Sequence, residues 1–147
     1  MTTPLASPEI AQRIGEELPQ AAPRAEGAAV LVEPSSLLEV ARFLRETPGL
    51  DFDYLASITA VDYLDYFEAV YRLVSMEHNH SLVLKARCGD RENPSLPSVV
   101  GLWRGADFQE REVFDLMGIR FEAHPNLRRI LTWEGFPGHP LRKDFLG

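Results

Sequence analysis

Hydrophobic and polar positions follow helical spacing in two segments of the first third of the chain. Residues 7–19 are predicted to form a helix, with Ser7 as its N-cap and Pro8 in the first turn. Residues 35–46 are predicted to form a second helix, because their apolar side chains recur every three or four positions. Between them, residues 28–32 are a short apolar run typical of a strand.

A period of two then marks three strands, over residues 52–60, 67–74 and 81–87. Their connections are short enough for hairpins, which indicates antiparallel neighbours with one face on a core. In the first strand, one set of alternate residues is expected to share the core side: Phe52, Tyr54, Ala56, Ile58 and Ala60. Two helices beside such a sheet predict an α+β domain, a small antiparallel sheet with helices on one face.

The last third begins with a helical pattern and then loses regularity. A helix is predicted over residues 98–117, with breaks allowed at two internal glycines, and Gly118 is placed as its C-cap. After Gly118 the prolines and the missing periodicity predict an extended tail, whose backbone must find partners on other surfaces. The predicted organisation is an α+β domain over residues 1–118 and an extended tail over 119–147.

One carboxylate of the predicted last helix lies in an unusual position. On a helical wheel Glu110 falls in the middle of the apolar arc, whereas Asp115 lies on the opposite, charged side. A carboxylate on an apolar face is costly unless it is paired and hydrogen-bonded. Two alternatives follow: Glu110 meets Arg128 or Arg129 of the tail, or it lies at the edge of the face and reaches water.

The charge distribution narrows the class of partner. The chain has 147 residues and a net charge of -7, which disfavours nucleic acid because phosphates would repel it. Residues 118–147 nevertheless carry five Lys or Arg against three Asp or Glu. A basic tail on an acidic body predicts that the tail lies against an acidic surface, on this body or on a partner.

Few residues suggest a cofactor or a membrane anchor. The single cysteine, Cys88, cannot form an internal disulfide or hold an iron–sulfur cluster by itself. The N-terminus lacks the pattern of a signal peptide, and no run approaches about 20 apolar residues, so any membrane contact is expected through a partner. His78 and His80 form a weak metal pattern in a predicted turn, without an evident third ligand.

A long signature runs through the last third. It begins E-R-E-V-F-D-L-M-G-I at residues 110–119, continues F-E-A-H-P-N-L-R-R-I-L at 121–131, and closes G-H-P-L-R-K-D-F at 138–145. This stretch resembles the C subunit of the NADH-quinone oxidoreductase called respiratory complex I, and its length makes it far more specific than a short motif. Ala123 and Trp133 depart from the family pattern, which more often has glycine and proline there.

The resemblance implies a role in assembly. In this family the C subunit lies in the hydrophilic arm of a proton-translocating complex, at the cytoplasmic side of the inner (plasma) membrane, as a peripheral protein. It packs on the D subunit, and the D and B subunits form the quinone pocket. FMN and the iron–sulfur clusters that carry electrons from NADH to quinone belong to other subunits, so this chain is expected to bind no cofactor or metal and to hold no catalytic residue. The residues expected at the interface with the D subunit are Glu110, Arg111, Asp115, His124, Arg128, Arg129, His139, Arg142, Lys143 and Asp144.

Other interpretations stay open at this stage. The chain could be the matching subunit of a ferredoxin-linked dehydrogenase or of a membrane-bound hydrogenase. Rivals of other classes are a stand-alone metal-dependent hydrolase that uses its histidines, and a free-standing protein-binding module. Several of the residues expected at the interface could instead tie the tail to its own domain.

Overall fold

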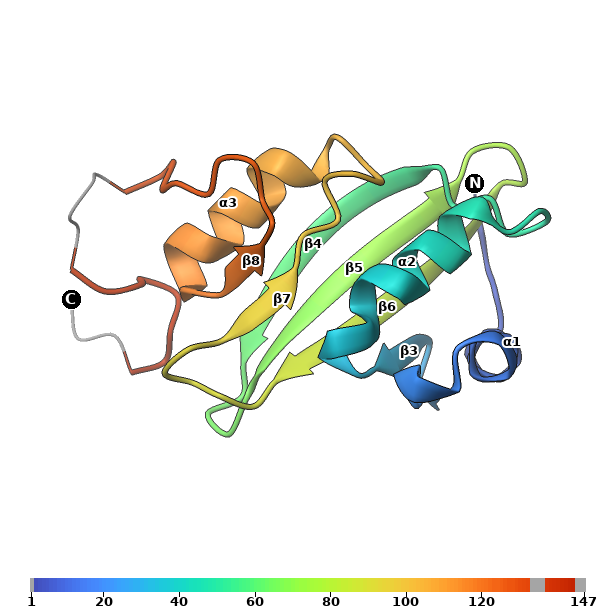
Figure 1. Ribbon diagram of the computed structural model, residues 1–147, viewed down its shortest axis with the longest axis horizontal. Coiled ribbons are helices and arrows are strands. Elements are labelled where there is room, and N and C mark those ends of the chain that lie inside the picture. Colours follow the sequence, from blue (N-terminus) through green and yellow to red (C-terminus); the bar gives the residue numbers. More distant parts are fainter. Residues whose placement is uncertain (1, 133–136, 145–147) are drawn as a thin grey trace.

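A single sheet with its helices on one face forms the body of the protein (Figure 1). Over the residues that the computed structural model describes, 2–132 and 137–144, the sheet has six strands and carries three α-helices. One cluster of buried apolar side chains joins the inner face of the sheet to all three helices. The predicted α+β class is therefore confirmed.

The central three strands form an antiparallel meander. They are β4 (Tyr54–Asp62), β5 (Phe67–Ser75) and β6 (His80–Cys88). Beyond β6 the sheet is mixed, because β3 (Ala29–Val32) runs parallel to β6. The other two strands of this sheet are β1 (Thr3–Pro4), parallel to β6, and β2 (Arg24–Glu26), antiparallel to β3.

A bulge changes which side of β4 faces the core. The register with β5 shifts between Leu55 and Ser57, so Ala56 is the extra residue on β4. Leu55 and Ile58 are both buried although they lie three positions apart, and Tyr54 is 53% exposed. The prediction that Tyr54 and Ala56 share the core side was wrong, because a strict period of two does not survive a bulge.

The first two helices cover the sheet near β3 and β6, and each is slightly shorter than predicted. Helix α1 (Ser7–Glu17) has Ala6 as its N-cap, while the Ser7 hydroxyl donates to the carbonyl of Gly27 at 2.7 Å. Ser7 as N-cap was therefore wrong: its side chain holds the β2–β3 turn instead. Helix α2 covers Leu37–Glu46. Two 3-10 turns accompany these helices, Pro19–Ala21 and Pro34–Ser36.

The third helix is shorter than predicted. Helix α3 covers Ala106–Met117, and the residues before it form turns and the short strand β7 (Ser95–Pro97). The prediction of a helix from residue 98 was wrong at its start, where two glycines weaken helical propensity. Strand β7 pairs in parallel with β8 (Arg120–Glu122), so the tail begins with a strand that the pattern did not predict.

Gly118 ends α3 in the predicted way and is also a point of close approach. Its φ is 78°, in the left-handed region, and its N–H bonds to the carbonyl of Phe114. A β-carbon built on Gly118 would lie 2.6 Å from Nη2 of Arg142 and 2.7 Å from Cδ2 of His139. The tail therefore covers the end of α3 so closely that only glycine leaves room for it.

We expect Gly118→Ala to lower the free energy of unfolding by about 1–2 kcal/mol for the backbone conformation alone. Displacement of Arg142 and His139 adds to this cost. Urea denaturation of the two proteins measures the difference. Gly105→Ala is the matched control, since Gly105 has a φ of −61° and no neighbour within 4 Å of the added carbon. Equal losses at both positions would contradict the role given to Gly118.

Candidate interface formed by helix α3 and the tail

Glu110 is fully buried and binds the segment that precedes its own helix. Its side chain has no exposed area. Oε1 accepts a hydrogen bond from the Ser98 hydroxyl at 2.6 Å, and Oε2 accepts one from the Val99 N–H at 2.8 Å. Both predicted alternatives, a tail arginine and water at the edge of the face, were wrong. Because α3 starts at residue 106, the turns before it fold back over the helix and bring their own donors.

Burial makes the Glu110 carboxyl a weak acid. Desolvation raises its pKa from 4.5 to about 7, against the two hydrogen bonds, which lower it, and with a smaller contribution from Asp107, which also raises it. The group is therefore neutral or only partly ionised near neutral pH. A buried carboxyl of this kind satisfies backbone donors at a smaller desolvation cost than a permanent carboxylate.

His124 closes the same region from the tail side. Its side chain is buried, and Nε2 lies 3.9 Å from Oε1 of Glu110. The Asn126 N–H donates to Nδ1 at 2.9 Å, so the proton of the neutral ring is on Nε2, which lies 3.2 Å from the Asp107 carbonyl oxygen. His124 thus fixes the turn after β8 to the first turn of α3.

Asp115 is the main attachment of the tail to α3. It was predicted on the charged, solvent side of the helix, but it has no exposed area. That prediction was wrong because the tail covers this side. Oδ2 accepts hydrogen bonds from three successive N–H groups, those of Ile130, Leu131 and Thr132, at 3.1, 2.6 and 2.8 Å, and Oδ1 accepts one from the Thr132 hydroxyl. Burial alone would raise the pKa of Asp115, but these bonds lower it below its ordinary value.

Two further tail residues surround Asp115. Arg129 Nη1 lies 3.7 Å from Oδ1 of Asp115, and Nη2 of Arg129 donates to the Gly138 carbonyl at 2.9 Å. His139 donates from Nδ1 to the backbone carbonyl of Asp115 at 2.8 Å. Burial, and then the nearby arginine charges, lower the pKa of His139 despite that bond, so the ring stays neutral near pH 7. The two ends of the described tail therefore meet at one residue of α3.

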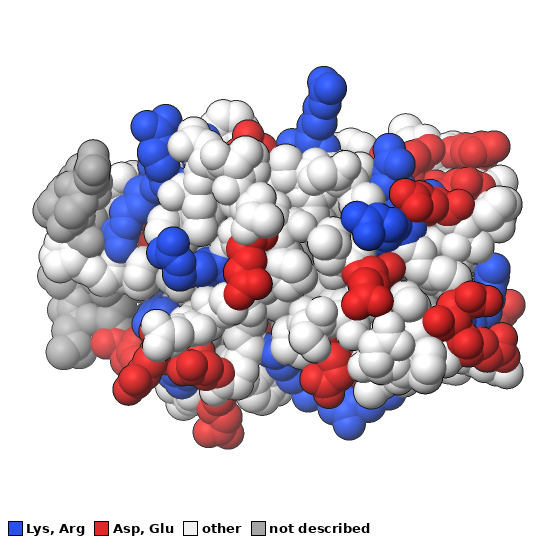
Figure 2. Space-filling model, in the orientation of Figure 1, with Lys and Arg blue, Asp and Glu red and all other residues white. Residues whose placement is uncertain are grey.

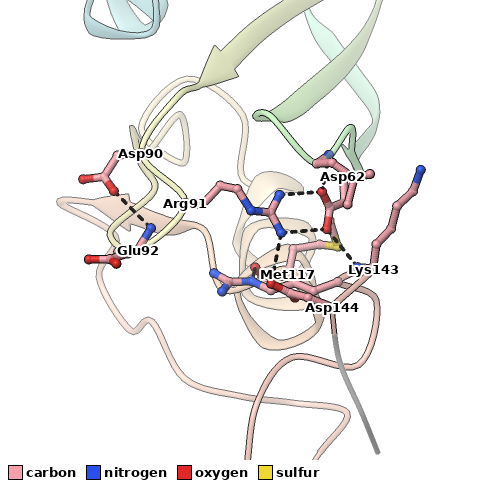
Figure 3. A network of polar contacts seen from close by, with 9 residues as sticks. Asp62, Asp90, Arg91, Glu92, Met117, Lys143 and Asp144 are labelled. Carbon is pink, nitrogen blue, oxygen red and sulfur yellow. Dashed lines mark hydrogen bonds and ion pairs between the residues drawn. The ribbon is translucent and has the colours of Figure 1, made fainter.

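A second attachment joins the end of the tail to β4 (Figure 3). Arg91 binds Asp62 through two hydrogen bonds of 2.5 and 3.1 Å and also lies 3.3 Å from Asp144. The Lys143 N–H donates to Asp62 Oδ2 at 2.8 Å, while its side chain points away from the network. The Arg91 guanidinium holds the pKa of the Asp62 carboxyl well below its ordinary value.

The sequence interpretation missed both Asp62 and Arg91. Asp62 is in phase with Ile58 and Ala60 along β4, so a carboxylate on the core-facing set was a usable signal. No comparable signal marks Arg91, which lies in the loop after β6. Its guanidinium stacks on Phe67 at 4.5 Å, and that of Arg142 stacks on the same ring at 4.8 Å. Arg142 also donates to the Met117 carbonyl at 2.7 Å, and burial lowers its pKa.

The remaining predicted residues are nearer to solvent. Arg111 donates to the carbonyl of Arg128 at 3.3 Å, and its guanidinium lies 5.2 Å from the ring of Phe108. Arg128 itself is exposed, and its side chain makes no ion pair with any described residue. Most of the ten predicted residues therefore bind the protein's own chain, whereas the side chains of Arg128 and Lys143 are presented outward. Contact of any of the ten with a partner stays a prediction.

Among the described residues, groups with ligand chemistry do not gather at this site. Cys88 is buried, and desolvation raises the pKa of its thiol to about 11, so it is a thiol at neutral pH. His124 and His139 each use a ring nitrogen for the protein's own backbone. His80 does the same, with Nε2 2.7 Å from the Leu50 carbonyl. What the arrangement does is hold an irregular segment in place, with buried carboxyls as acceptors.

The same α3 and tail lie in the region that comparison with known proteins matches. The family model for the respiratory-chain NADH dehydrogenase 30 kDa subunit matches residues 30–147. The chain belongs to this family. The match covers β3 through the tail and includes Glu110, Asp115 and every attachment described above.

Individual relatives agree with the family. The NADH-quinone oxidoreductase C subunit 2 of Rhizobium meliloti (strain 1021) is 48% identical over 120 residues, which cover 80% of this chain and 65% of the relative. The NADH-quinone oxidoreductase C subunit of Roseiflexus sp. (strain RS-1) is 49% identical over 118 residues, or 78% of this chain and 67% of the relative. The chain therefore spans about two thirds of the length of these curated relatives.

A solved structure shows the same fold. A chain in the structure of the membrane-bound sulfane sulfur reductase, an archaeal respiratory membrane complex, matches with a TM-score of 0.73 and 28% identity. The match covers 93% of this chain and 84% of that one. The fold thus occurs in subunits of more than one kind of respiratory membrane complex.

We expect Asp115→Asn to release the tail from α3. The amide offers one acceptor in place of two, so hydrogen bonds to the tail backbone and to Thr132 are lost, at a cost of about 2–3 kcal/mol in the free energy of unfolding. Brief trypsin digestion followed by mass spectrometry should show faster cleavage after Arg128 and Arg129. Glu112→Gln, on the exposed side of the same helix, is the control. Unchanged cleavage in Asp115→Asn would refute the attachment.

Glu110 predicts a specific dependence of stability on pH. Its pKa is raised in the folded protein, so its protonated form stabilises the fold fully below about pH 4.5, and this contribution is lost as the pH rises through about 7. Glu110→Gln keeps a neutral group there. The free energy of unfolding of the variant minus that of the wild type should therefore rise by on the order of 3 kcal/mol between pH 4.5 and 8. Denaturation series across that range, with Glu112→Gln as reference, test this; parallel curves for wild type and Glu110→Gln would contradict it.

Proposed function

We propose that this chain is a cofactor-free subunit of the hydrophilic arm of a proton-translocating NADH-quinone oxidoreductase. In that role it packs on the D subunit, near the B subunit and the quinone site, and supports electron transfer from NADH through FMN and iron–sulfur clusters held elsewhere. The observation that carries the proposal is the outward surface of α3 and the tail, which belongs to the family signature and is not used by the chain's own attachments.

That surface combines exposed apolar and cationic groups. Phe108, Leu131 and Leu141 are 65%, 60% and 58% exposed. Arg128 and Lys143 are exposed on the same segments. Because α3 and the tail lie together at one end of the molecule (Figure 1), these groups suit a protein partner that offers apolar contacts and carboxylates.

A groove beside these groups adds shape to the surface. It lies between β4 and α3 and has a volume of about 250 Å³. Ala60, Leu116 and Leu141 lie on its walls, and Glu112 is the charged residue of its lining. Since β4 is the edge of the sheet, the groove offers a mainly apolar recess next to an edge strand, a suitable seat for a side chain of a neighbouring subunit.

The distribution of charge supports the same orientation. In Figure 2, Lys and Arg predominate on the visible face over α3 and the adjoining tail, while Asp and Glu predominate at the opposite end. The basic tail predicted from the sequence thus keeps part of its charge for contact with another molecule. The acidic end would face away from the D subunit.

Redox groups and membrane attachment are assigned to the partners. One buried cysteine with a raised pKa is a poor ligand for iron, which supports a cofactor-free role. Within residues 2–132 and 137–144, no helix combines the length and apolar character that crossing a bilayer requires. A peripheral position on the cytoplasmic side of the inner membrane, held through the complex, is consistent with both facts.

The decisive experiment is recovery of the complex through this chain. The tagged chain, expressed in its native cells, should bring down the D subunit and iron–sulfur subunits from detergent-extracted membranes, as identified by mass spectrometry. Arg128→Glu combined with Leu141→Asp should reduce the recovered D subunit by roughly tenfold or more, since both changes act at the proposed contact. Met76→Asp is the control, because Met76 is 71% exposed in the turn between β5 and β6. Recovery of the wild-type chain without other subunits would overturn the proposal.

A second candidate is the matching subunit of a related complex, such as a ferredoxin-linked dehydrogenase or a membrane-bound hydrogenase. The structural match to a chain of the sulfane sulfur reductase favours keeping it. The recovered complex separates the two candidates. Quinone reduction driven by NADH supports the first, and reduction driven only by reduced ferredoxin supports the second.

A further inference from the structure

The end of the molecule opposite the tail holds a group of metal-ligating side chains that the proposed function does not use. Two loops meet there (Figure 1): the loop between α2 and β4, and the turn between β5 and β6. Asp51 belongs to the first, and Glu77 and His78 belong to the second. One donor atom from each of the three lies within 4.8 Å of the others.

The donors come from segments that the fold already holds together. His78 Nε2 lies 2.7 Å from Asp51 Oδ2, so an imidazole and a carboxylate are adjacent without any rearrangement. The Gly49 N–H donates to the same Asp51 oxygen at 2.9 Å, which sets the direction of the carboxylate. The hydrogen bond from His78 lowers the pKa of Asp51, so the group is ionised and available as a ligand at neutral pH.

A buried neighbour orients the imidazole. The His80 ring stacks on the His78 ring with centroids 5.5 Å apart. His80 is itself fixed, because its Nε2 bonds the Leu50 carbonyl and its ring packs on Phe52 at 4.9 Å. The Ser75 hydroxyl accepts a hydrogen bond from the His78 N–H at 3.1 Å and holds the turn. His80, which the sequence pattern paired with His78 as a ligand, is thus a support for His78 rather than a second donor.

We propose that Asp51, Glu77 and His78 bind one divalent first-row transition ion, with Zn²⁺ or Ni²⁺ as the suitable class. One imidazole and two carboxylates match the ligand types of these ions, and two negative charges neutralise the ion. Mg²⁺ and Ca²⁺ are less suitable because both favour an all-oxygen shell. Water completes the coordination, since all three donors reach the surface.

Binding has a definite chemical cost and consequence. The Nε2 lone pair must be free, so the proton that Nε2 now directs at Asp51 moves to Nδ1, or leaves to solvent if the ring is doubly protonated. The ion replaces the hydrogen bond between His78 and Asp51. It ties the β5–β6 turn to the α2–β4 loop and therefore stabilises the folded state by mass action.

Calorimetric titration of the tag-free, metal-free 147-residue chain with ZnCl₂ tests the site. One equivalent of Zn²⁺ should bind, and a thermal shift on its addition should disappear with EDTA. His78→Ala and Asp51→Asn should each weaken binding by roughly tenfold or more, because each removes a ligand. Glu46→Gln removes one surface carboxylate outside the cluster and should leave binding unchanged.

The outcomes distinguish this site from binding elsewhere on the chain. Circular dichroism of each variant verifies that it is folded, and His78→Gln replaces the imidazole with a side chain of similar polarity if His78→Ala is unstable. Absence of binding at millimolar Zn²⁺ overturns the proposal. So does one equivalent bound equally well by wild type and by both ligand variants, which would place the ion at different residues. Neither result bears on recovery of the respiratory subunits, since the cluster lies away from the proposed contact.

Discussion

Burial of two carboxyl groups on one helix organises the C-terminal half of this protein. Glu110 and Asp115 lie on different sides of α3, and each accepts hydrogen bonds from backbone that has no partner in a helix or sheet. Glu110 holds the turns before the helix, and Asp115 holds the tail after it. Irregular backbone is costly to bury without acceptors, so these two side chains allow segments without regular structure to cover α3 closely.

The two carboxyls act in different charge states. Glu110 has two donors, one of them a hydroxyl, in an apolar setting, and its pKa rises to about 7. Asp115 has four donors and Arg129 nearby, and its pKa falls. The number of donors, rather than burial alone, decides between a neutral and an ionised acid. The attachment of the tail therefore depends on a charge that persists at all physiological pH values, whereas the start of the helix is held by a group that titrates.

The second attachment extends the same logic to the sheet. Asp62 at the end of β4 receives Arg91 and the Lys143 backbone, and Arg91 and Arg142 cover the Phe67 ring (Figure 3). With these contacts made, the groups left facing outward on this end of the molecule are mainly apolar side chains and two cations. A subunit whose tail is already anchored presents a preorganised surface, and so a partner need not supply the ordering free energy of the tail. The tail is thus best understood as part of the domain surface that a neighbouring subunit would contact.

The sequence alone determined the elements whose side-chain period is set by burial on one face. The helices α1 and α2, the strand order of the β4–β5–β6 meander, the Gly118 cap and the family itself were readable, because each depends on local pattern or on a long motif. The tertiary structure decided the rest. The bulge at Ala56, the late start of α3 and the strand β8 depend on pairing between distant segments. The partners of Glu110 and Asp115 followed the same rule: their position on a helical wheel showed that one carboxylate needed a donor, but only the folded chain determined that backbone N–H groups, not arginines, would supply it.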